Sequence, residues 1–204
     1  IISGTLALGP DWSVALSPGR LIAGSPDESG VRAFGLGTTG PIGADDRSVL
    51  LTSDDPDIRL GADIDVVPDI DGDTLPELIV GAPQDARSGL TRHDGAVWLI
   101  PGSALEATGE LSADAVALAV ILGDNEGAEL GRVVAGCADL NGDGLGDFAT
   151  GAPLDSTRDT LAGRVAVVLS TDLPDLASRE TVQSLEHRYT GEGVGSRAGS
   201  SIDC

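Results

Sequence analysis

Two short acidic loops constrain this chain more than any other feature of its sequence. Each loop places oxygen-bearing side chains at its first, third, fifth and ninth positions, and a short apolar run then leads into Gly-Ala-Pro. The side chains are Asp69, Asp71, Asp73 and Glu77 in the first loop and Asp139, Asn141, Asp143 and Asp147 in the second. Because converging carboxylates repel one another without a cation, this repeated spacing favours a metal-binding loop over a solvated acidic turn.

Calcium is the cation that best fits these loops. It takes roughly six to eight oxygen ligands in a flexible shell, and the seventh position of such a loop supplies a backbone carbonyl, here that of Leu75 or Leu145. An EF-hand loop also needs a glutamate at its twelfth position. That position holds Val80 and Thr150, each inside a strand-like run, which excludes a helix-loop-helix site.

Composition limits the class of protein. With 29 Gly, 11 Pro, 41% hydrophobic and 2% aromatic residues among 204, the chain favours an aliphatic core with many short strands and turns. Acidic residues outnumber basic ones 33 to 12, and the net charge of −21 excludes a nucleic-acid partner. The longest uncharged apolar run, at residues 115–123, is far shorter than the roughly 20 residues that span a membrane.

The acidic loops belong to longer internal repeats. In each unit a glycine opens a first strand, and then follow the loop, a second strand, Gly-Ala-Pro, a variable polar loop, a third strand and a fourth apolar run. The opening glycines are Gly9, Gly61, Gly131 and Gly199. Four strands in each repeat of roughly 50–70 residues are typical of β-propeller blades.

The repeats predict strands at defined positions. First strands are expected at 63–67 and 132–135, third strands at 95–100 and 163–169, and fourth strands at 116–122 and, more weakly, at 181–185. The first repeat lacks the acidic loop, so Ser17-Pro-Gly-Arg20 is expected to form a tight turn, with later strands at 30–34 and 48–52. Residues 199–204 repeat the start of the second unit and are expected to open a further blade.

These features resemble the FG-GAP repeat, the calcium-binding blade of the integrin α-subunit propeller and its bacterial relatives. The resemblance rests on Leu60-Gly61 and Leu130-Gly131 in place of Phe-Gly, on Gly81-Ala-Pro83 and Gly151-Ala-Pro153, and on the loops between them. It implies an all-β fold with four antiparallel strands in each blade. It also implies a single FG-GAP segment over residues 1–204, with blades at 9–60, 61–130 and 131–198 and the start of another at 199–204.

A closed propeller takes roughly four to eight blades, so the chain is expected to form an incomplete propeller. The rest of a longer chain, or other copies of this one, would then complete the ring. In this family the loop between the first two strands of a blade binds calcium, which implies two sites here. The implied ligands are Asp69, Asp71, Asp73, Leu75 and Glu77, and Asp139, Asn141, Asp143, Leu145 and Asp147.

The first loop departs from the family pattern at two positions. Glu77 replaces the usual final aspartate, and Thr74 replaces a glycine. The longer side chain of Glu77 is still expected to reach the ion, with weaker affinity.

No catalytic constellation is visible in the sequence. His93 and His187 are the two histidines, and neither stands beside a candidate nucleophile. The chain has no Gly-x-Ser-x-Gly elbow, His-Glu-x-x-His zinc helix or Walker loop. Gly191-Glu-Gly-Val-Gly195 matches part of a dinucleotide fingerprint, but no helix is expected after it. The chain is therefore predicted to be non-catalytic.

The resemblance implies a secreted or cell-surface module that binds a protein or a glycan in adhesion. Two alternatives remain open, namely an accessory propeller of a larger secreted hydrolase and a subunit of a surface filament or sheath. The variable loops at 84–94 and 154–162 form the candidate binding surface, although ordinary solvated insertions explain them equally well. Cys137 and Cys204 can pair or remain free, and pairing requires their Cα atoms to lie within about 7 Å.

Overall fold

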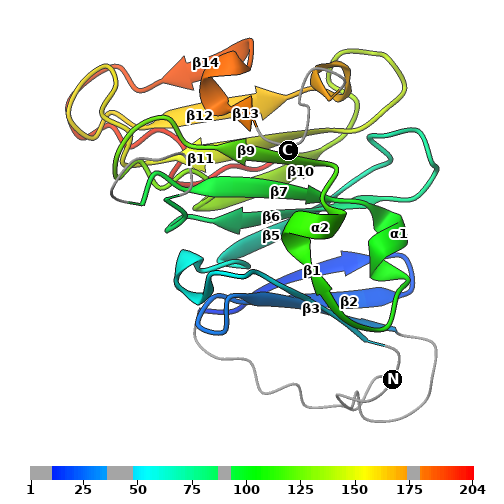
Figure 1. Ribbon diagram of the computed structural model, residues 1–204. Coiled ribbons are helices and arrows are strands. Elements are labelled where there is room, and N and C mark those ends of the chain that lie inside the picture. Colours follow the sequence, from blue (N-terminus) through cyan, green and yellow to red (C-terminus); the bar gives the residue numbers. More distant parts are fainter. Residues whose placement is uncertain (1–10, 36–47, 87–92, 174–179) are drawn as a thin grey trace.

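The computed structural model describes residues 11–35, 48–86, 93–173 and 180–204, which fold into three stacked β-sheets (Figure 1). In each sheet, four antiparallel strands follow one another in chain order. The first sheet contains β1 (Ser13–Ser17), β2 (Arg20–Ser25), β3 (Gly30–Gly35) and β4 (Val49–Thr52). The second contains β5 (Asp63–Val67), β6 (Glu77–Ala82), β7 (Ala96–Ile100) and β9 (Ala119–Leu122). The third contains β10 (Val133–Cys137), β11 (Asp147–Ala152), β12 (Arg164–Val168) and β14 (His187–Thr190). The expected all-β fold of four-stranded units is confirmed, and the sheets do not close into a ring.

Two further strands connect neighbouring sheets, one between the first and second sheets and one between the second and third. β8 (Gly109–Ser112) pairs in parallel with β4, and β13 (Glu180–Thr181) pairs in parallel with β9. Each comes from the connection between the third and fourth strands of the following sheet. This connection also holds short helical turns, α1 (Gly102–Leu105) and α2 (Ala113–Val116) in the second sheet and η2 (Ser170–Asp172) and η3 (Val182–Ser184) in the third. Another turn, η1 (Pro56–Ile58), precedes β5. The outer strands β4 and β9 are therefore both covered by a segment of the next repeat.

The fourth strand of the third repeat is not where the sequence places it. Residues 181–185 were expected to form this strand, but they hold the end of β13 and the turn η3, and the outer strand is β14. Val182 and Leu185 are only 1% and 2% exposed because they pack into the core between the second and third sheets. Their apolar character therefore indicates burial, whereas β14 is polar because it lies at a sheet edge.

The hydrophobic core lies between the sheets in two layers. Ile22 and Leu51 of the first sheet pack in one cluster with Leu78, Val80 and Trp98 of the second. The opposite face of the second sheet packs on the third, through a cluster of Ile79, Val97, Leu99, Ile121, Phe148, Ala166 and Val168. Because alternate residues of a strand face opposite sides of its sheet, β6 and β7 are buried on both faces, and all their side chains except that of Glu77 are apolar.

Glycines make the closest contacts between neighbouring sheets. A second-strand glycine lies against the opening glycine of the next repeat in three places: Gly24 on Gly61, Gly81 on Gly131, and Gly151 on Gly199. A Cβ atom added to the second-strand glycine would lie 2.3, 1.9 and 2.2 Å, respectively, from the carbonyl oxygen of its partner. The glycine of Gly-Ala-Pro is therefore required because two backbones meet where no side chain fits.

The tight turn and the cysteine pair are both visible in the structure. Ser17 pairs with Arg20 across a two-residue turn in which Gly19 has φ +74°, as the Pro-Gly sequence predicts. Cys137, at the end of β10, forms a disulfide with Cys204, and their Cα atoms lie 5.0 Å apart. The two cysteines are therefore paired in the structure rather than free. Among the described residues, no helix is both long enough and apolar enough to cross a membrane.

Candidate metal centre

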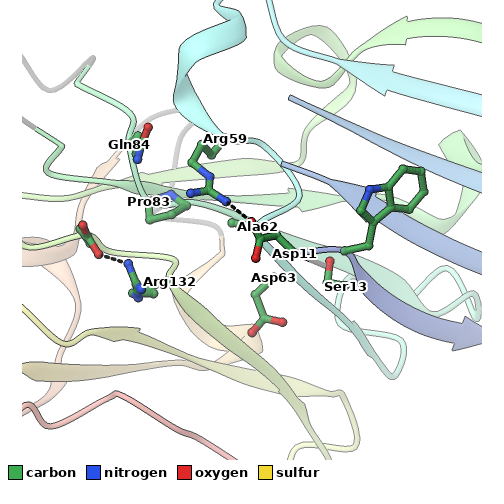
Figure 2. Close-up of a pocket in the computed structure, with 10 residues that line it drawn as sticks. Asp11, Ser13, Arg59, Ala62, Asp63, Pro83, Gln84 and Arg132 are labelled. Carbon is green, nitrogen blue, oxygen red and sulfur yellow. Dashed lines mark hydrogen bonds and ion pairs between the residues drawn. The ribbon is translucent and has the colours of Figure 1, made fainter. Parts of the chain in front are cut away.

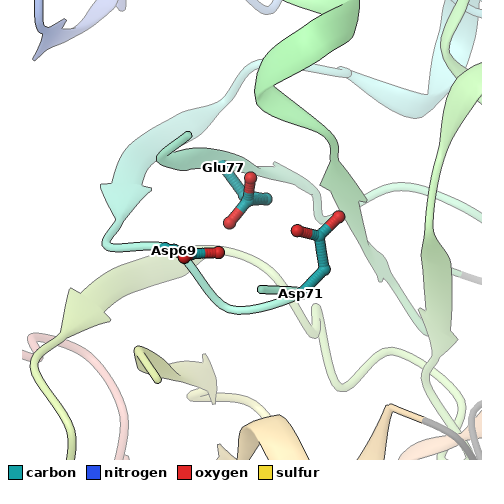
Figure 3. A group of neighbouring side chains, drawn as sticks. All are labelled: Asp69, Asp71 and Glu77. Atoms are coloured by element: carbon teal, nitrogen blue, oxygen red, sulfur yellow. The ribbon is translucent and has the colours of Figure 1, made fainter. Parts of the chain in front are cut away.

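Three carboxylates converge in the first acidic loop. This loop joins β5 to β6, with Asp69 and Asp71 in the loop and Glu77 at the first position of β6. A carboxylate oxygen from each of the three lies within 4.8 Å of the others, and Figure 3 shows the side chains facing a common space. Over the described ranges of the chain, this is the only group of three or more acidic, histidine or cysteine side chains with such spacing.

Aspartate side chains wind the first loop by accepting hydrogen bonds from its own backbone. Asp69 accepts from the amides of Gly72, at 2.7 Å, and Thr74, at 3.0 Å. Asp71 accepts from the amide of Asp73, and Asp73 from that of Leu75. Short polar side chains favour such local turns, so the acidic residues fold the loop as well as lining it.

Glu77 is a buried carboxyl group beside other acidic groups. Its side chain is fully buried and accepts a 2.8 Å hydrogen bond from the amide of Ile70. Burial, together with the nearby charges of Asp71 and Asp73, raises the pKa of Glu77 to about 7. The donor set consists of hard oxygen atoms with an excess of negative charge, and it fits a hard divalent cation.

The second loop repeats this backbone design with a different arrangement of side chains. Asp139 accepts from the amides of Gly142 and Gly144, at 2.6 and 2.8 Å. Asp147 is fully buried at the start of β11 and accepts from the amide of Leu140 at 2.6 Å. These contacts match those of Asp69 and Glu77 in the first loop, so both loops share one fold.

Asp143 has a partner outside the second loop. Its carboxylate accepts hydrogen bonds from the hydroxyl of Ser170 and from the side-chain amide of Asn141, the latter at 3.0 Å. The Ser170 hydrogen bond is the largest cause of a lowered pKa of Asp143. The carboxylate of Asp143 is thus held in a defined orientation, although the second loop does not gather three carboxylates as closely as the first.

The predicted ligands therefore differ in how closely they assemble. Of the ten, the structure brings together Asp69, Asp71 and Glu77, while Asp73 and Leu75 lie in the same loop. The predicted residues of the second loop occupy the matching positions. Sequence reasoning missed Ser170, and only its place two residues after the third strand of the repeat, where the second blade has Gly102, could have indicated it.

Thr74 is strained in the first loop. It has φ +76°, in the left-handed region, where the second loop has Gly144 with φ +92°. A β-branched residue in this region is an outlier that costs about 1–2 kcal/mol. We expect Thr74→Gly to raise the melting temperature by a few degrees in the absence of divalent cations, and Gly144→Thr to lower it. A lower melting temperature for Thr74→Gly would show that the threonine is not strained.

A polar cavity of about 450 Å³ lies at the other end of β5, near Asp63 (Figure 2). It is lined by Asp11, Trp12, Ser13, Arg59, Ala62, Asp63, Pro83, Gln84, Glu129 and Arg132. Arg59 pairs with Asp11 at 3.7 Å, and Arg132 pairs with Glu129. The cavity includes Gln84 from the candidate binding loop at 84–94, of which residues 87–92 lie outside the described part of the chain.

Comparison with known families agrees with this arrangement of loops and strands. Residues 60–100 and 130–168 each match the FG-GAP repeat. No curated protein sequence matches the chain significantly. Each matched segment begins directly before an opening glycine, contains one acidic loop and ends with the third strand of its sheet. The chain therefore carries two FG-GAP repeats, one in each sheet with an acidic loop, and its four-stranded sheets are consistent with β-propeller blades.

Proposed function

We propose that this protein is a non-catalytic, calcium-binding β-propeller module that acts outside the cell by binding a protein or a glycan. The convergence of Asp69, Asp71 and Glu77 at the base of an FG-GAP blade carries the proposal. A bound divalent cation would offset the repulsion among these carboxylates and the burial of Glu77. The cation would also draw together the two strands that each loop connects.

Both acidic loops take part in the proposed function. In the first, the side chains of Asp69, Asp71, Asp73 and Glu77 and the carbonyl of Leu75 would hold the ion. In the second, the ligands would be the side chains of Asp139, Asn141, Asp143 and Asp147 and the carbonyl of Leu145. All of these donors are oxygen atoms, as calcium prefers, and both loops enter a buried second strand.

Removal of calcium is expected to destabilise the protein. A ligand present at 100 times its dissociation constant stabilises the folded state by about 2.7 kcal/mol for each site. Thermal melts with calcium and with EDTA measure this difference. Asp71→Ala and Asp143→Ala should each remove the contribution of one site, whereas Asp54→Ala, at an exposed position outside both loops, should leave the calcium effect intact. Identical melting temperatures with calcium and EDTA would refute calcium binding.

An extracellular location is supported by the disulfide between Cys137 and Cys204, because such bonds persist mainly in oxidising compartments. The polar cavity near Asp63 and the loops at 84–94 and 154–162 are the proposed recognition surface. The cavity is lined by both guanidinium and carboxylate groups, which can form hydrogen bonds and ion pairs with the polar surface of a protein or glycan.

Completion of the propeller by further blades is part of this proposal. The outer strands β4 and β9 are each covered by a strand of the next repeat, whereas β14 has no such cover among the described residues. Exposed strand edges template association with other strands. Light scattering on the isolated 204 residues should therefore reveal self-association, and a monodisperse folded monomer of 20.5 kDa would argue against an incomplete propeller.

A further inference from the structure

We propose that Ser170, which lies outside both acidic loops, is a positioning residue of the second calcium site and makes that site the tighter of the two. The inference rests on the proposed calcium function. It concerns a part of the blade that the loop sequence does not include, namely the turn that follows the third strand.

Ser170 contacts two of the proposed ligands at once. It is the first residue of η2 and is only 6% exposed. Its hydroxyl donates a hydrogen bond to Oδ2 of Asp143, and its backbone amide donates to Oδ1 of Asp147 at 2.9 Å. The fifth and ninth positions of the loop are therefore both fixed to one buried residue of another segment.

The first loop has only part of this arrangement. Gly102 occupies the matching position, and its amide lies 3.4 Å from Oε1 of Glu77. It carries no hydroxyl, so within the described residues the carboxylate of Asp73 accepts a hydrogen bond only from the amide of Leu75. Asp73, at the fifth position of the first loop, thus has no anchor outside its own loop in the described part of the chain.

The structure also shows why the second blade, which holds the first acidic loop, cannot have a serine at this position. A Cβ atom on Gly102 would lie 2.6 Å from the carbonyl oxygen of Pro76 and 2.7 Å from Cβ of Leu75. The longer Glu77 takes the place of the aspartate in this blade. In the second blade Gly102 lies beside Glu77, whereas in the third blade Ser170 lies beside Asp147. The two acidic loops are therefore supported by different residues.

Hydrogen bonds from outside a metal site orient the ligands, and their loss typically reduces metal affinity by about 10–100-fold. Because Ser170 restricts Asp143 and Asp147 before the ion arrives, less side-chain freedom is lost on binding. The second loop should accordingly bind calcium more tightly than the first.

Isothermal titration with calcium can test each site separately. The Asp71→Ala background isolates the second site, and the Asp143→Ala background isolates the first. In the former, Ser170→Ala should weaken calcium binding by about 10-fold or more, and Ser170→Thr, which keeps the hydroxyl, should restore most of the affinity. In the latter, Ser170→Ala should leave the affinity of the first site unchanged, which makes this background the matched control.

The outcomes separate the inference from the proposed function. A wild-type protein that binds no calcium overturns both. Binding at two sites with Ser170→Ala within about twofold of the wild-type affinity overturns the inference alone, as does an equal loss at both sites. Melting temperatures in EDTA establish that each variant is folded. If Ser170→Ala does not fold, Ser170→Gly, which reproduces the residue of the second blade, replaces it in the same comparison.

Discussion

Replacing Gly81 with alanine is expected to lower the free energy of unfolding by about 3 kcal/mol or more, at the upper end of the usual cost of overpacking. The added Cβ would lie 1.9 Å from the carbonyl oxygen of Gly131, and this atom belongs to the backbone of the next sheet. Rotation of a side chain cannot relieve this clash, because it involves a Cβ atom and a backbone oxygen. The two sheets must therefore separate. Their separation would also open the apolar cluster around Val97 and Phe148.

Thermal or urea unfolding measures the effect of this substitution. A loss of 3 kcal/mol corresponds to a melting temperature about 6–12 °C lower for a chain of this size. Gly193→Ala is the matched control, because a Cβ at this partly exposed glycine meets nothing within 4 Å. If Gly81→Ala melted at the same temperature as Gly193→Ala, the close contact between the second and third sheets would be wrong.

The repeated strands could be predicted from the sequence because their signals are local. The range 63–67 agrees with β5 at both ends. The predicted third strand at 95–100 begins one residue before β7, and the one at 163–169 extends one residue beyond β12 at each end. In these segments a short run rich in aliphatic residues, an opening glycine and a following loop all indicate the same structure. Such agreement between local signals makes a strand predictable.

The parallel strands β8 and β13 could not be predicted in the same way. β8 pairs with β4, which lies in the preceding repeat, and Gly109 and Glu110 of β8 are exposed. A short polar segment carries no hydrophobic alternation, so its pairing depends on where the preceding sheet places its outer edge. The fourth strand of the third repeat was wrongly expected at 181–185 for the same reason. The actual strand, β14, is a polar edge strand and carries no hydrophobic alternation.

For the candidate metal centre, too, some features could be predicted from the sequence and others could not. Spacing within each loop predicts the candidate ligand positions, and the hydrogen bonds that wind the loop are equally local, since they join residues two to five positions apart. The orientation of Asp143 depends instead on Ser170, which follows the third strand. Loop spacing alone therefore predicted which side chains could bind an ion but not how closely they converge.

Loss of the disulfide is expected to cost about 4 kcal/mol in the free energy of unfolding. Cys137 and Cys204 are 67 positions apart, and the chain-entropy estimate for a closed loop of this length gives that value. The bond also holds the C-terminal segment beside β10, whose last residue is Cys137, two positions before Asp139 of the second loop. We expect the proposed calcium site of the second loop to weaken together with the fold when the bond is absent.

Urea unfolding of the wild type with and without reductant, and of Cys204→Ser, tests this expectation. The reduced wild type and Cys204→Ser should share one lowered midpoint, because each lacks the same covalent link and keeps the rest of the chain. Adding reductant to Cys204→Ser is the control and should change nothing. Thiol titration of the unfolded, unreduced wild type should detect no free thiol. Two free thiols per chain would mean that the segment from Gly199 to Cys204 does not lie against β10 in solution, and the contact between Gly151 and Gly199 would then be in doubt as well.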